Sequence, residues 1–584
     1  MPQLMKSFWL GCLLTAISAC SLATRQEVSN TVRIRWARDP ETLSPLALPN
    51  PSAIDATNLL HCGLLQINFS ADSYSPALAD SLPQVRLLGD SLQLLRYQLR
   101  KEATWDNGQP VLATDVAFTL KLLRCPGLPN ELSRAQYAFI QAIELDATNP
   151  RRFTLVCRGQ ASSYSGQSGD FPILPEAALD PAHTLRRFSL ASLSNSTTSA
   201  APALVALAQR YQQADPGHHP ERLPGCGAYQ LAHWETGRSL AFARKRHWWA
   251  DTLRPTPFVL QAQPAQLHFS IIPDEAMAVL ALRRHEIDVL PQLSARTFRR
   301  LQKNPAAQKE LAFYSTTSYD VVTVGFNTQR VSLQDPLTRQ ALSRLFDPAQ
   351  LLQATQLGQG MLTVGLVHPA DRRYYNDSLP LPAFSPSQAQ ALLRQAGWQR
   401  QPTGWVRPNA RHSPESLALT LRYRAGEPTF ETIALQFKAA ATALGIPVAL
   451  RPTETSSLTT ALREGDFDIN VRTLKGNPFA FNYAPILHSR TTREGNFTKF
   501  SNQASDQLME AISAASVPAE KRRLLRRFQA MLQQQAPLVP LFFLPYRLAT
   551  AKQLRHVYPS KLKPGYDAAA MTWEVAPKPA APAQ

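Results

Sequence analysis

The stretch YQLRKEATWDNGQPVLATDVAF, residues 97–118, has the most informative local pattern in this 584-residue chain. Asn107 and Gly108 together are typical of a tight hairpin turn, because both residue types tolerate the left-handed backbone that such turns require. Thr114 and Asp115 suit the cap and the first turn of a helix. The stretch therefore predicts a strand, a turn and a helix in succession, and its residues build a scaffold rather than carry chemistry.

Strand and helix patterns alternate on both sides of this stretch. Strand patterns are found at 31–36, 92–99, 152–157, 267–272, 321–326, 417–423 and 447–451. Helical patterns are found at 114–123, 275–284, 336–345, 387–396, 429–444 and 519–534. Composition predicts loops at 39–51, 159–169 and 192–201 and a Pro/Ala linker at 576–584. The alternation predicts an α/β fold, and a hydrophobic content of 44% suffices for two or three packed units.

The first twenty residues, MPQLMKSFWLGCLLTAISAC, have the features of an export signal. Their apolar run ends at Ile17 and is about half the ~20 residues that a membrane-spanning helix needs. The last four residues resemble a bacterial lipobox, which predicts removal of residues 1–19 and lipidation of Cys20. We therefore expect a periplasmic, cell-envelope protein that is anchored to a membrane through this lipid. An ordinary signal peptide is the alternative, because Ala16 and Ser18 also suit an A-x-A cleavage site.

Four cysteines remain once the signal segment and Cys20 are set aside: Cys62, Cys125, Cys157 and Cys226. In an oxidising compartment four thiols allow three disulfide connectivities, and the sequence alone does not choose among them. We favour Cys62 with Cys226 and Cys125 with Cys157. The wide spacing differs from the close CxxC pairs of zinc sites, so we expect no metal at these residues.

The chain has 61 Lys and Arg against 43 Asp and Glu, a formal net charge of +18. Such an excess can attract anions, nucleic acid or acidic lipid headgroups. The basic residues are, however, spread along the whole chain. The cluster at 522–527 falls on the polar face of the helix expected at 519–534. We therefore interpret the charge as solvated surface and expect no nucleic-acid partner.

Known catalytic motifs give no support for an enzyme. The sequence contains no GxSxG elbow, HExxH helix or Walker loop. Ser560 and Lys563 have SxxK spacing, but they precede a proline and lack the partner motifs of penicillin-binding enzymes. His218 and His219 are adjacent in a Pro/Gly-rich segment, which indicates an exposed loop. We expect no catalytic activity, no metal and no cofactor.

Short blocks in a fixed order resemble extracellular solute-binding protein family 5, which contains dipeptide-, oligopeptide- and nickel-binding receptors. Residues 97–118 are similar to the most specific signature of that family. The other matching blocks follow the family order and cover nearly the whole chain after the signal: 39–45, 76–79, 171–175, 225–229, 246–249, 283–289, 325–341, 392–397 and 465–468.

The resemblance implies a periplasmic-binding-protein fold of class II, cluster C type, with two lobes that close on a ligand by hinge motion. Lobe I would comprise 30–269 plus 491–575, with 77–223 as an extra subdomain, and lobe II would comprise 270–490. It implies an ABC-importer substrate-binding lipoprotein. Such a protein captures a peptide or peptide-like solute in the interlobe cleft and delivers it to membrane permease subunits.

One segment departs from the peptide-binding pattern. In peptide-binding members, the strand after "fD" leads into a Trp and then an acidic residue that pairs with the free amine of the peptide. Residues 468–482, DINVRTLKGNPFAFN, contain no carboxylate after Asp468 and carry Arg472 and Lys475 instead. Because a cation repels an ammonium group, the segment favours an anionic, blocked or non-peptide solute. Solvent exposure of both basic residues is the alternative.

Other expected ligand contacts are polar or aromatic residues near predicted strand ends and in the opening loop: Asp39, Thr42, Trp248, Tyr319, Asp320 and Arg424. A lipoprotein of this fold that senses a ligand, or that has a structural role without transport, remains an alternative function. Anionic non-peptide solutes, haem and metal chelates remain alternative ligands.

Overall fold

The computed structural model describes residues 30–574, apart from 48–49, 90, 162, 195–200, 409–413, 477–478, 480 and 516. The expected signal segment 1–19, the lipidation site Cys20 and the tail 576–584 lie outside the described residues. Within the described part of the chain, no helix is both long enough and apolar enough to cross a membrane.

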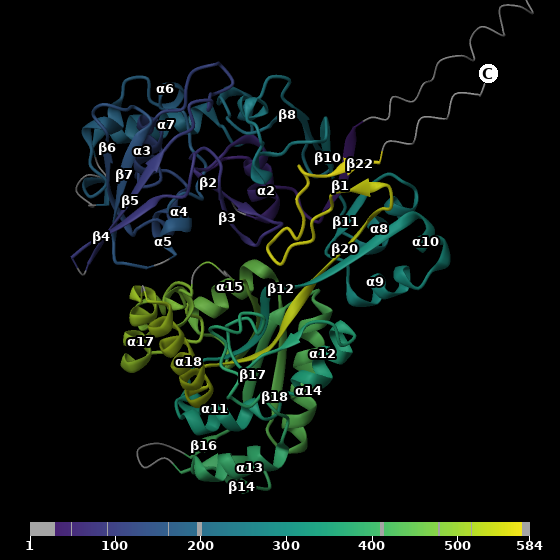
Figure 1. Cartoon of the computed structure of the whole chain (residues 1–584). Coiled ribbons are helices and arrows are strands. Elements are labelled where there is room, and N and C mark those ends of the chain that lie inside the picture. Colours follow the sequence, from purple (N-terminus) through teal and green to yellow (C-terminus); the bar gives the residue numbers. More distant parts are fainter. Residues whose placement is uncertain are drawn as a thin grey trace, which may run out of the picture.

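An eleven-stranded sheet extends through both halves of the molecule (Figure 1). Its strand order is β18-β17-β19-β12-β20-β11-β1-β10-β9-β8, with β13 paired to β20 at the side. The strands are β1 (Thr31–Trp36), β8 (Tyr229–Glu235), β9 (Ser239–Arg244), β10 (Gln266–Ile271), β11 (Val289–Pro291), β12 (Leu311–Phe326), β13 (Met361–Leu362), β17 (Leu419–Arg424), β18 (Val448–Thr453), β19 (Ile469–Leu474) and β20 (Leu538–Ala551).

Two long antiparallel strands, β12 and β20, connect the two lobes seen in Figure 1. Residues 311–317 pair with 545–551 in one lobe, and residues 321–325 pair with 538–543 in the other. The register shifts between Thr317 and Val321, opposite Pro545, which has no N–H to donate. We call this irregular stretch the hinge. Lobe I is the part of the chain before the hinge together with residues 545–574, and lobe II is residues 321–543.

The hydrophobic clusters agree with this division. Two clusters lie in lobe I: one surrounds Ile34 and Phe269, and the other joins the 278–311 segment to Ala549. Two others lie on lobe II, with Phe326 in one and Phe528 in the other. Successive residues of β12 point to opposite faces, so Val322 and Val324 enter one lobe II cluster and Val321 enters the other.

The expected lobe boundaries at 270 and 490 differ from the packing. Helices α8 (Glu275–Arg283), α9 (Ala295–Gln302) and α10 (Pro305–Glu310) pack against β11 and β20 in lobe I. Helices α17 (Gln503–Ala514) and α18 (Pro518–Gln535) pack against Val321 and Leu538 in lobe II. The difference arises because β12 and β20 cross between the lobes, whereas the sequence pattern predicted only 321–326 as a strand.

Helices cover both faces of the lobe II sheet. The cluster on one face includes residues of α11 (Pro336–Ser343), α12 (Pro348–Gln356), α13 (Pro386–Gln395) and α14 (Pro428–Ala443). The other face is covered by α16 (Ala484–Leu487), α17 and α18, while α15 (Thr455–Glu464) precedes β19. A small sheet of β14 (Gln399–Gln401), β15 (Gly404–Arg407) and β16 (Glu415–Ser416) stands apart at the foot of this lobe (Figure 1).

The stretch 97–118 lies in the subdomain of lobe I. A four-stranded sheet in the order β4-β5-β7-β6 forms this unit, from β4 (Gln84–Leu88), β5 (Leu92–Gln98), β6 (Ile140–Leu145) and β7 (Arg152–Arg158). Gly108 has a φ of 81°, which confirms the predicted turn. Helix α3 (Ala113–Leu122) begins one residue before the expected cap Thr114, and Leu112 is the capping residue. The Asp115 carboxylate accepts the N–H groups of Leu112 and Glu176, both at 2.9 Å.

Most expected elements agree with the structure to within two residues, including β1, β5, β7, β10, β17, β18, α3, α8, α11, α13, α14 and α18. Two expected loops contain short helical turns: α5 (Tyr164–Gln167) within 159–169 and a 3₁₀ turn (Ser192–Ser194) within 192–201. Remaining elements are α2 (Pro51–Leu60), α4 (Glu131–Gln136), α6 (Glu176–Leu179), α7 (Pro202–Ala214), β2 (Leu65–Asn68), β3 (Ser73–Pro76), β21 (Leu554–Arg555) and β22 (Thr572–Trp573).

Candidate functional site

A loop of the C-terminal segment lies between the lobes, beside the crossing of β12 and β20 (Figure 1, yellow). We call residues 556–571 the hinge loop. The Ser560 hydroxyl donates to Asp72 Oδ1 of lobe I at 3.0 Å, and the Tyr319 amide at the hinge donates to the Lys561 carbonyl at 3.4 Å. The hinge loop is therefore held between lobe I and the point where the two lobes meet.

Charged groups gather at this point. Asp320 lies at the end of the hinge on β12 and is 8% exposed. Its Oδ2 accepts the Tyr546 hydroxyl at 2.9 Å and lies 3.8 Å from Lys563 Nζ of the hinge loop. The neighbouring Lys561 Nζ lies 3.5 Å from Asp72 Oδ2. Asp320 thus links both crossing strands to the hinge loop.

Lys475 joins this group from lobe II. The residue after it, Gly476, passes so close to the hinge that an added Cβ would lie 2.2 Å from the Tyr319 carbonyl oxygen. Burial lowers the pKa of the Lys475 ammonium, the charge of Lys563 lowers it further and Asp320 raises it. Lys475 therefore lies within electrostatic range of both Lys563 and Asp320. Among the described residues its own ammonium forms no ion pair.

The cluster has an excess of positive charge. Lys475, Lys561 and Lys563 face the carboxylates of Asp72 and Asp320. A third acid, Asp55 on α2, interacts with Lys563. Burial raises the pKa of the Asp55 carboxyl to about 7, and the charge of Lys563 opposes this rise. At neutral pH this carboxyl carries only part of a negative charge, so the carboxyls of the cluster only partly balance its three lysines.

Aromatic rings lie beside the lysines. The His368 imidazole lies between the rings of Tyr319 and Phe543, with centroids 5.0 and 4.6 Å away. Burial lowers the pKa of His368 to about 4, and the nearby Lys561 lowers it as well. At neutral pH this histidine is uncharged, so the side chains next to the cluster form an apolar and aromatic wall.

A second contact joins the lobes away from the crossing strands. Tyr74 on β3 of lobe I packs on Phe479, which follows β19 of lobe II, with ring centroids 4.4 Å apart. The Tyr74 hydroxyl donates to Asp170 Oδ2 at 2.7 Å, and the Tyr137 hydroxyl donates to Oδ1 at 2.8 Å. Asp170 therefore orients the lobe I partner of this contact.

Asp170 predicts a pH dependence of stability. Burial raises its pKa from 3.8 to about 6, against the lowering effect of its two tyrosine hydrogen bonds. A carboxyl whose pKa is raised on folding binds its proton more tightly in the folded chain than in the unfolded chain. The protonated carboxyl therefore stabilises the fold fully below pH 3.8, and this stabilisation is lost as the pH rises through about 6. We expect wild type to gain about 1–3 kcal/mol relative to Asp170→Asn between pH 7 and pH 4.

Urea unfolding of both proteins at several pH values measures this effect. The difference between the two curves isolates Asp170, because Asp55 and Asp567 also have raised pKa values and are present in both proteins. Parallel stability profiles over the whole range would show that Asp170 does not titrate in this way.

Three expected contact residues lie inside lobe I instead of at the cluster. Asp39 Oδ2 accepts the Gly237 amide at 2.7 Å and the Trp234 indole at 3.3 Å, and Thr42 Oγ1 accepts the Ser44 amide at 3.1 Å. The Trp248 indole donates to the Cys226 carbonyl at 2.9 Å, and the ring is 5% exposed. Their polar atoms hold local loops and the core together.

Two expected basic contacts lie elsewhere in lobe II. Arg424 at the end of β17 pairs with Glu427, three residues later. Arg472 packs over the Phe497 ring, 4.9 Å from its centroid, and lines a cavity of about 20 Å³ with Asn470 and seven other residues. Burial lowers its pKa to about 10. Arg472 faces inward because residues 470, 472 and 474 share one face of β19. Lys475 is not held to either face of the sheet because the strand ends at Leu474.

The structure therefore brings together Tyr319, Asp320 and Lys475 from the expected set. It adds Asp72, Tyr546, Lys561 and Lys563, which sequence reasoning missed. The segment SKLKPGY, residues 560–566, offered one signal, since two lysines two positions apart precede a proline. Only the crossing of β12 and β20 places that segment beside Lys475.

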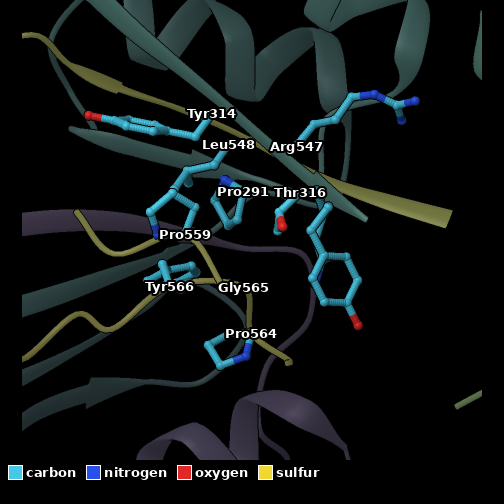
Figure 2. Close-up of a pocket in the computed structure, with 11 residues that line it drawn as sticks. Pro291, Tyr314, Thr316, Arg547, Leu548, Pro559, Pro564, Gly565 and Tyr566 are labelled. Atoms are coloured by element: carbon cyan, nitrogen blue, oxygen red, sulfur yellow. The ribbon is translucent and has the colours of Figure 1, made fainter. Parts of the chain in front are cut away.

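A small cavity lies under the hinge loop (Figure 2). The crossing strands contribute Tyr314, Thr316 and Tyr546, and the hinge loop contributes Pro559, Pro564 and Tyr566. Its volume is about 10 Å³, which is close to the lower limit for one water molecule. The cavity is too small for a solute, so we place the candidate site at the charged cluster between the lobes.

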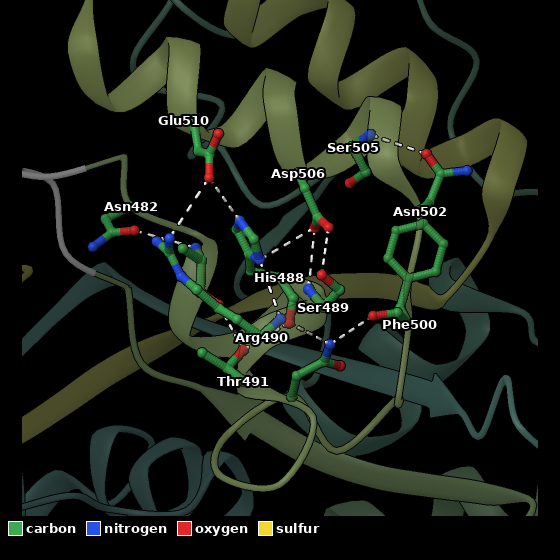
Figure 3. A network of polar contacts seen from close by, with 12 residues as sticks. Asn482, His488, Ser489, Arg490, Thr491, Phe500, Asn502, Ser505, Asp506 and Glu510 are labelled. Carbon is green, nitrogen blue, oxygen red and sulfur yellow. Dashed lines mark hydrogen bonds and ion pairs between the residues drawn. The ribbon is translucent and has the colours of Figure 1, made fainter.

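A polar network in lobe II contains serine, histidine and acidic residues (Figure 3). The Ser489 hydroxyl donates to Asp506 Oδ2 at 2.5 Å rather than to the imidazole. His488 Nδ1 accepts the Arg490 amide at 3.2 Å, and Nε2 lies 3.1 Å from Glu510 Oε1. The hydroxyl is held by the Asp506 carboxylate and not by the imidazole, so the network differs from a Ser-His-Asp arrangement, and its contacts hold the segment after α16 against α17.

The four buried cysteines are all free thiols in the structure. Cys62 and Cys226 lie in contact. Cys125 Sγ instead lies 3.6 Å from the Pro126 carbonyl, and Cys157 is in the middle of the subdomain sheet. Among the described residues, hydrogen bonds link Cys62 to Cys226, the first expected pair, and none joins Cys125 to Cys157, the second.

Comparison with known proteins gives the same fold. The oligopeptide-binding protein AppA of Bacillus subtilis, solved with a nonapeptide, is 16% identical with a TM-score of 0.72, over 93% of this chain and 98% of that one. The periplasmic EDTA-binding protein EppA is 17% identical with a TM-score of 0.74, over 94% and 97%. The dipeptide-binding protein of Escherichia coli K12 is 19% identical over 85% of this chain and 86% of its own length.

The family model of the bacterial extracellular solute-binding proteins, family 5 Middle, matches residues 73–493. This range includes the subdomain, β12, the lobe II strands β13 to β19, and the lobe II helices α11 to α16, but not β20. It also contains Tyr319, Asp320 and Lys475 of the hinge cluster. The chain therefore belongs to the bacterial extracellular solute-binding proteins of family 5.

Proposed function

We propose that this protein is the substrate-binding lipoprotein of an ABC importer. It captures a peptide-like solute between its lobes and delivers it to permease subunits in the membrane. The observation that carries the proposal is the hinge cluster, where charged groups from lobe I, lobe II and the crossing strands meet. A solute held there contacts both lobes at once, which is the requirement for a ligand to favour a closed state.

The crossing strands provide the motion. A register shift in β12 interrupts regular pairing between Thr317 and Val321, and Pro545 on β20 donates no hydrogen bond there. Because β12 and β20 share fewer backbone hydrogen bonds at the hinge, the two lobes can rotate about it while most of the strand pairing is kept. Tyr74 and Phe479 then meet in the closed arrangement and separate when the lobes open.

The proposed ligand is a peptide or peptide-like molecule that presents a carboxylate or another anionic group to the hinge. Lys475 supports this ligand class because it lies in the cluster without an ion-pair partner among the described residues. The aromatic wall of Tyr319 and His368 offers an apolar surface for the rest of the solute. AppA was solved with a peptide and EppA binds EDTA, so both a peptide and a polycarboxylate are compatible with this fold.

Export and anchoring complete the proposal. The N-terminal segment directs the chain out of the cytoplasm, and lipidation at Cys20 holds it at a membrane close to the permease. Restricting the receptor to a membrane surface raises its local concentration beside the importer.

A thermal-shift panel tests the function. We expect the melting temperature to rise with an anionic peptide-like solute by mass action, since the solute binds only the folded state. The panel contains free-amine dipeptides, N-succinyl peptides, EDTA chelates, citrate and haem. Lys438→Gln on the exposed face of α14 should keep the shift, whereas Lys475→Gln should reduce it. The absence of any shift across the panel would favour a structural lipoprotein.

A further inference from the structure

Cys62 and Cys226 lie against each other in lobe I, although 164 positions separate them in the sequence. The Cys62 amide donates to Cys226 Sγ at 3.3 Å, and Cys62 Sγ lies 3.5 Å from the Cys226 carbonyl oxygen. In turn, Cys226 Sγ lies 4.0 Å from the Cys62 carbonyl oxygen. Each sulfur therefore touches the main chain of the other cysteine.

Glycines on both sides of Cys226 produce this contact. A Cβ at Gly225 would lie 2.5 Å from the Leu60 carbonyl oxygen, and one at Gly227 would lie 2.3 Å from the Leu59 carbonyl oxygen. The Gly227 amide donates to the Leu60 carbonyl at 3.0 Å. Only glycine allows the two main chains to approach so closely, and this approach brings the backbones of Cys62 and Cys226 side by side, as a disulfide between them requires.

The surroundings of the pair are closed to solvent. Cys62 is 2% exposed and Cys226 is 1% exposed. The indoles of Trp248 and Trp249 both donate to the Cys226 carbonyl, at 2.9 and 2.8 Å. Hydrogen bonding with Cys226 and burial both raise the pKa of the Cys62 thiol. Once the chain has folded, this thiol is neutral and shielded from exchange, so any reaction between the two sulfurs occurs during folding.

We propose that Cys62 and Cys226 form a disulfide bond as the exported chain folds. One thiolate attacks a disulfide donor of the thiol–disulfide exchange class, and the resulting mixed disulfide is attacked by the second thiolate. Both thiols lose their protons, one new S–S bond forms, and the donor leaves as a dithiol. Cys125 and Cys157 remain thiols. The proposal depends on export to an oxidising compartment and on no particular ligand.

The bond closes a loop that contains the whole subdomain. It joins the end of α2 to the segment before β8, and the sheet of β4 to β7 lies between these two points of the chain. A cross-link over a long loop stabilises a fold chiefly by restricting the unfolded chain. α2 also carries Asp55, which acts on Lys563 of the hinge cluster, so the bond fixes one wall of the candidate site.

Peptide mapping of the full chain purified from the cell envelope tests the proposal. The protein is denatured without reductant, alkylated with iodoacetamide and digested. We expect the peptides of Cys62 and Cys226 to be linked to each other and those of Cys125 and Cys157 to be alkylated. Alkylation of all four, or a link that includes Cys125 or Cys157, would overturn the proposal.

Variants and reductant provide a second readout. Cys125→Ser should retain the link, whereas Cys62→Ser should leave Cys226 alkylated. The wild type and the Cys62→Ser/Cys226→Ser double variant are unfolded in urea with or without dithiothreitol, which reaches the bond once the chain has opened, and are refolded in the same buffer. The reduced wild type should melt on the order of 5 °C lower than the oxidised wild type, and the double variant should be unchanged. An equal response of the two proteins to dithiothreitol would contradict a stabilising bond.

Discussion

Lys475→Glu is expected to weaken binding of an anionic solute by about 100-fold, and Lys475→Gln by about tenfold. The ammonium of Lys475 lies at the hinge cluster without an ion-pair partner among the described residues, so the ligand is the group that it can neutralise. A carboxylate in its place would repel the ligand and would give Lys563, which lies 3.8 Å from Asp320, a second acidic neighbour. Isothermal titration with the solute that gives the largest thermal shift measures the change.

The matched control is Lys438→Glu on α14, which makes the same change of net charge far from the hinge. Any general effect of lower net charge appears in both variants, and only the local effect is specific to Lys475. Because Lys475 is an exposed residue and forms no ion pair among the described residues, the unliganded variant should keep its melting temperature. Equal affinities of the two variants would remove Lys475 from the binding site.

Arg339→Met is expected to lower the free energy of unfolding of lobe II by about 3 kcal/mol. The Arg339 side chain on α11 is 2% exposed. It donates to the carbonyls of Leu333 at 2.6 Å and Gln334 at 2.7 Å, and to those of Gln535 and Ala536 at the end of α18. The last carbonyls of a helix have no partner within the helix, so removal of the guanidinium leaves buried acceptors unsatisfied.

Urea unfolding followed by fluorescence measures the loss. Methionine keeps most of the buried length of the side chain, so the change reports the lost hydrogen bonds more than a cavity. Arg523→Met on the exposed face of α18 is the control, since among the residues that the structure describes this arginine forms its ion pair with the exposed Glu520. That variant should unfold as the wild type does. A loss below about 1 kcal/mol in Arg339→Met would show that water replaces the guanidinium at these carbonyls.

Local patterns predicted the regular elements well because they depend on neighbouring residues. Helix α14 follows from the apolar positions Phe430, Ile433 and Phe437, which recur with helical spacing and are all buried in lobe II. The length of β12 could not be predicted in this way. Its first half, residues 311–320, has no clear alternation of burial, and its pairing partner lies more than 200 positions away on β20.

The same limit explains the candidate site. Lys475 is predicted from its place in a motif, whereas the positions of Lys561 and Lys563 depend on long-range packing, since both lie in a segment without regular structure. Proximity in sequence predicts Arg472 beside Lys475. In the structure Arg472 lies within β19, where the alternation of side chains directs it into lobe II.

The most direct test is native mass spectrometry of the protein purified from its own host in mild detergent. The account predicts a wild-type protein that carries one small molecule with an acidic group, and a Lys475→Glu variant that has lost it. An acidic ligand identified in this way would also name the importer's substrate class. An empty wild-type protein that also fails to bind every solute of the thermal-shift panel would contradict the proposed receptor function.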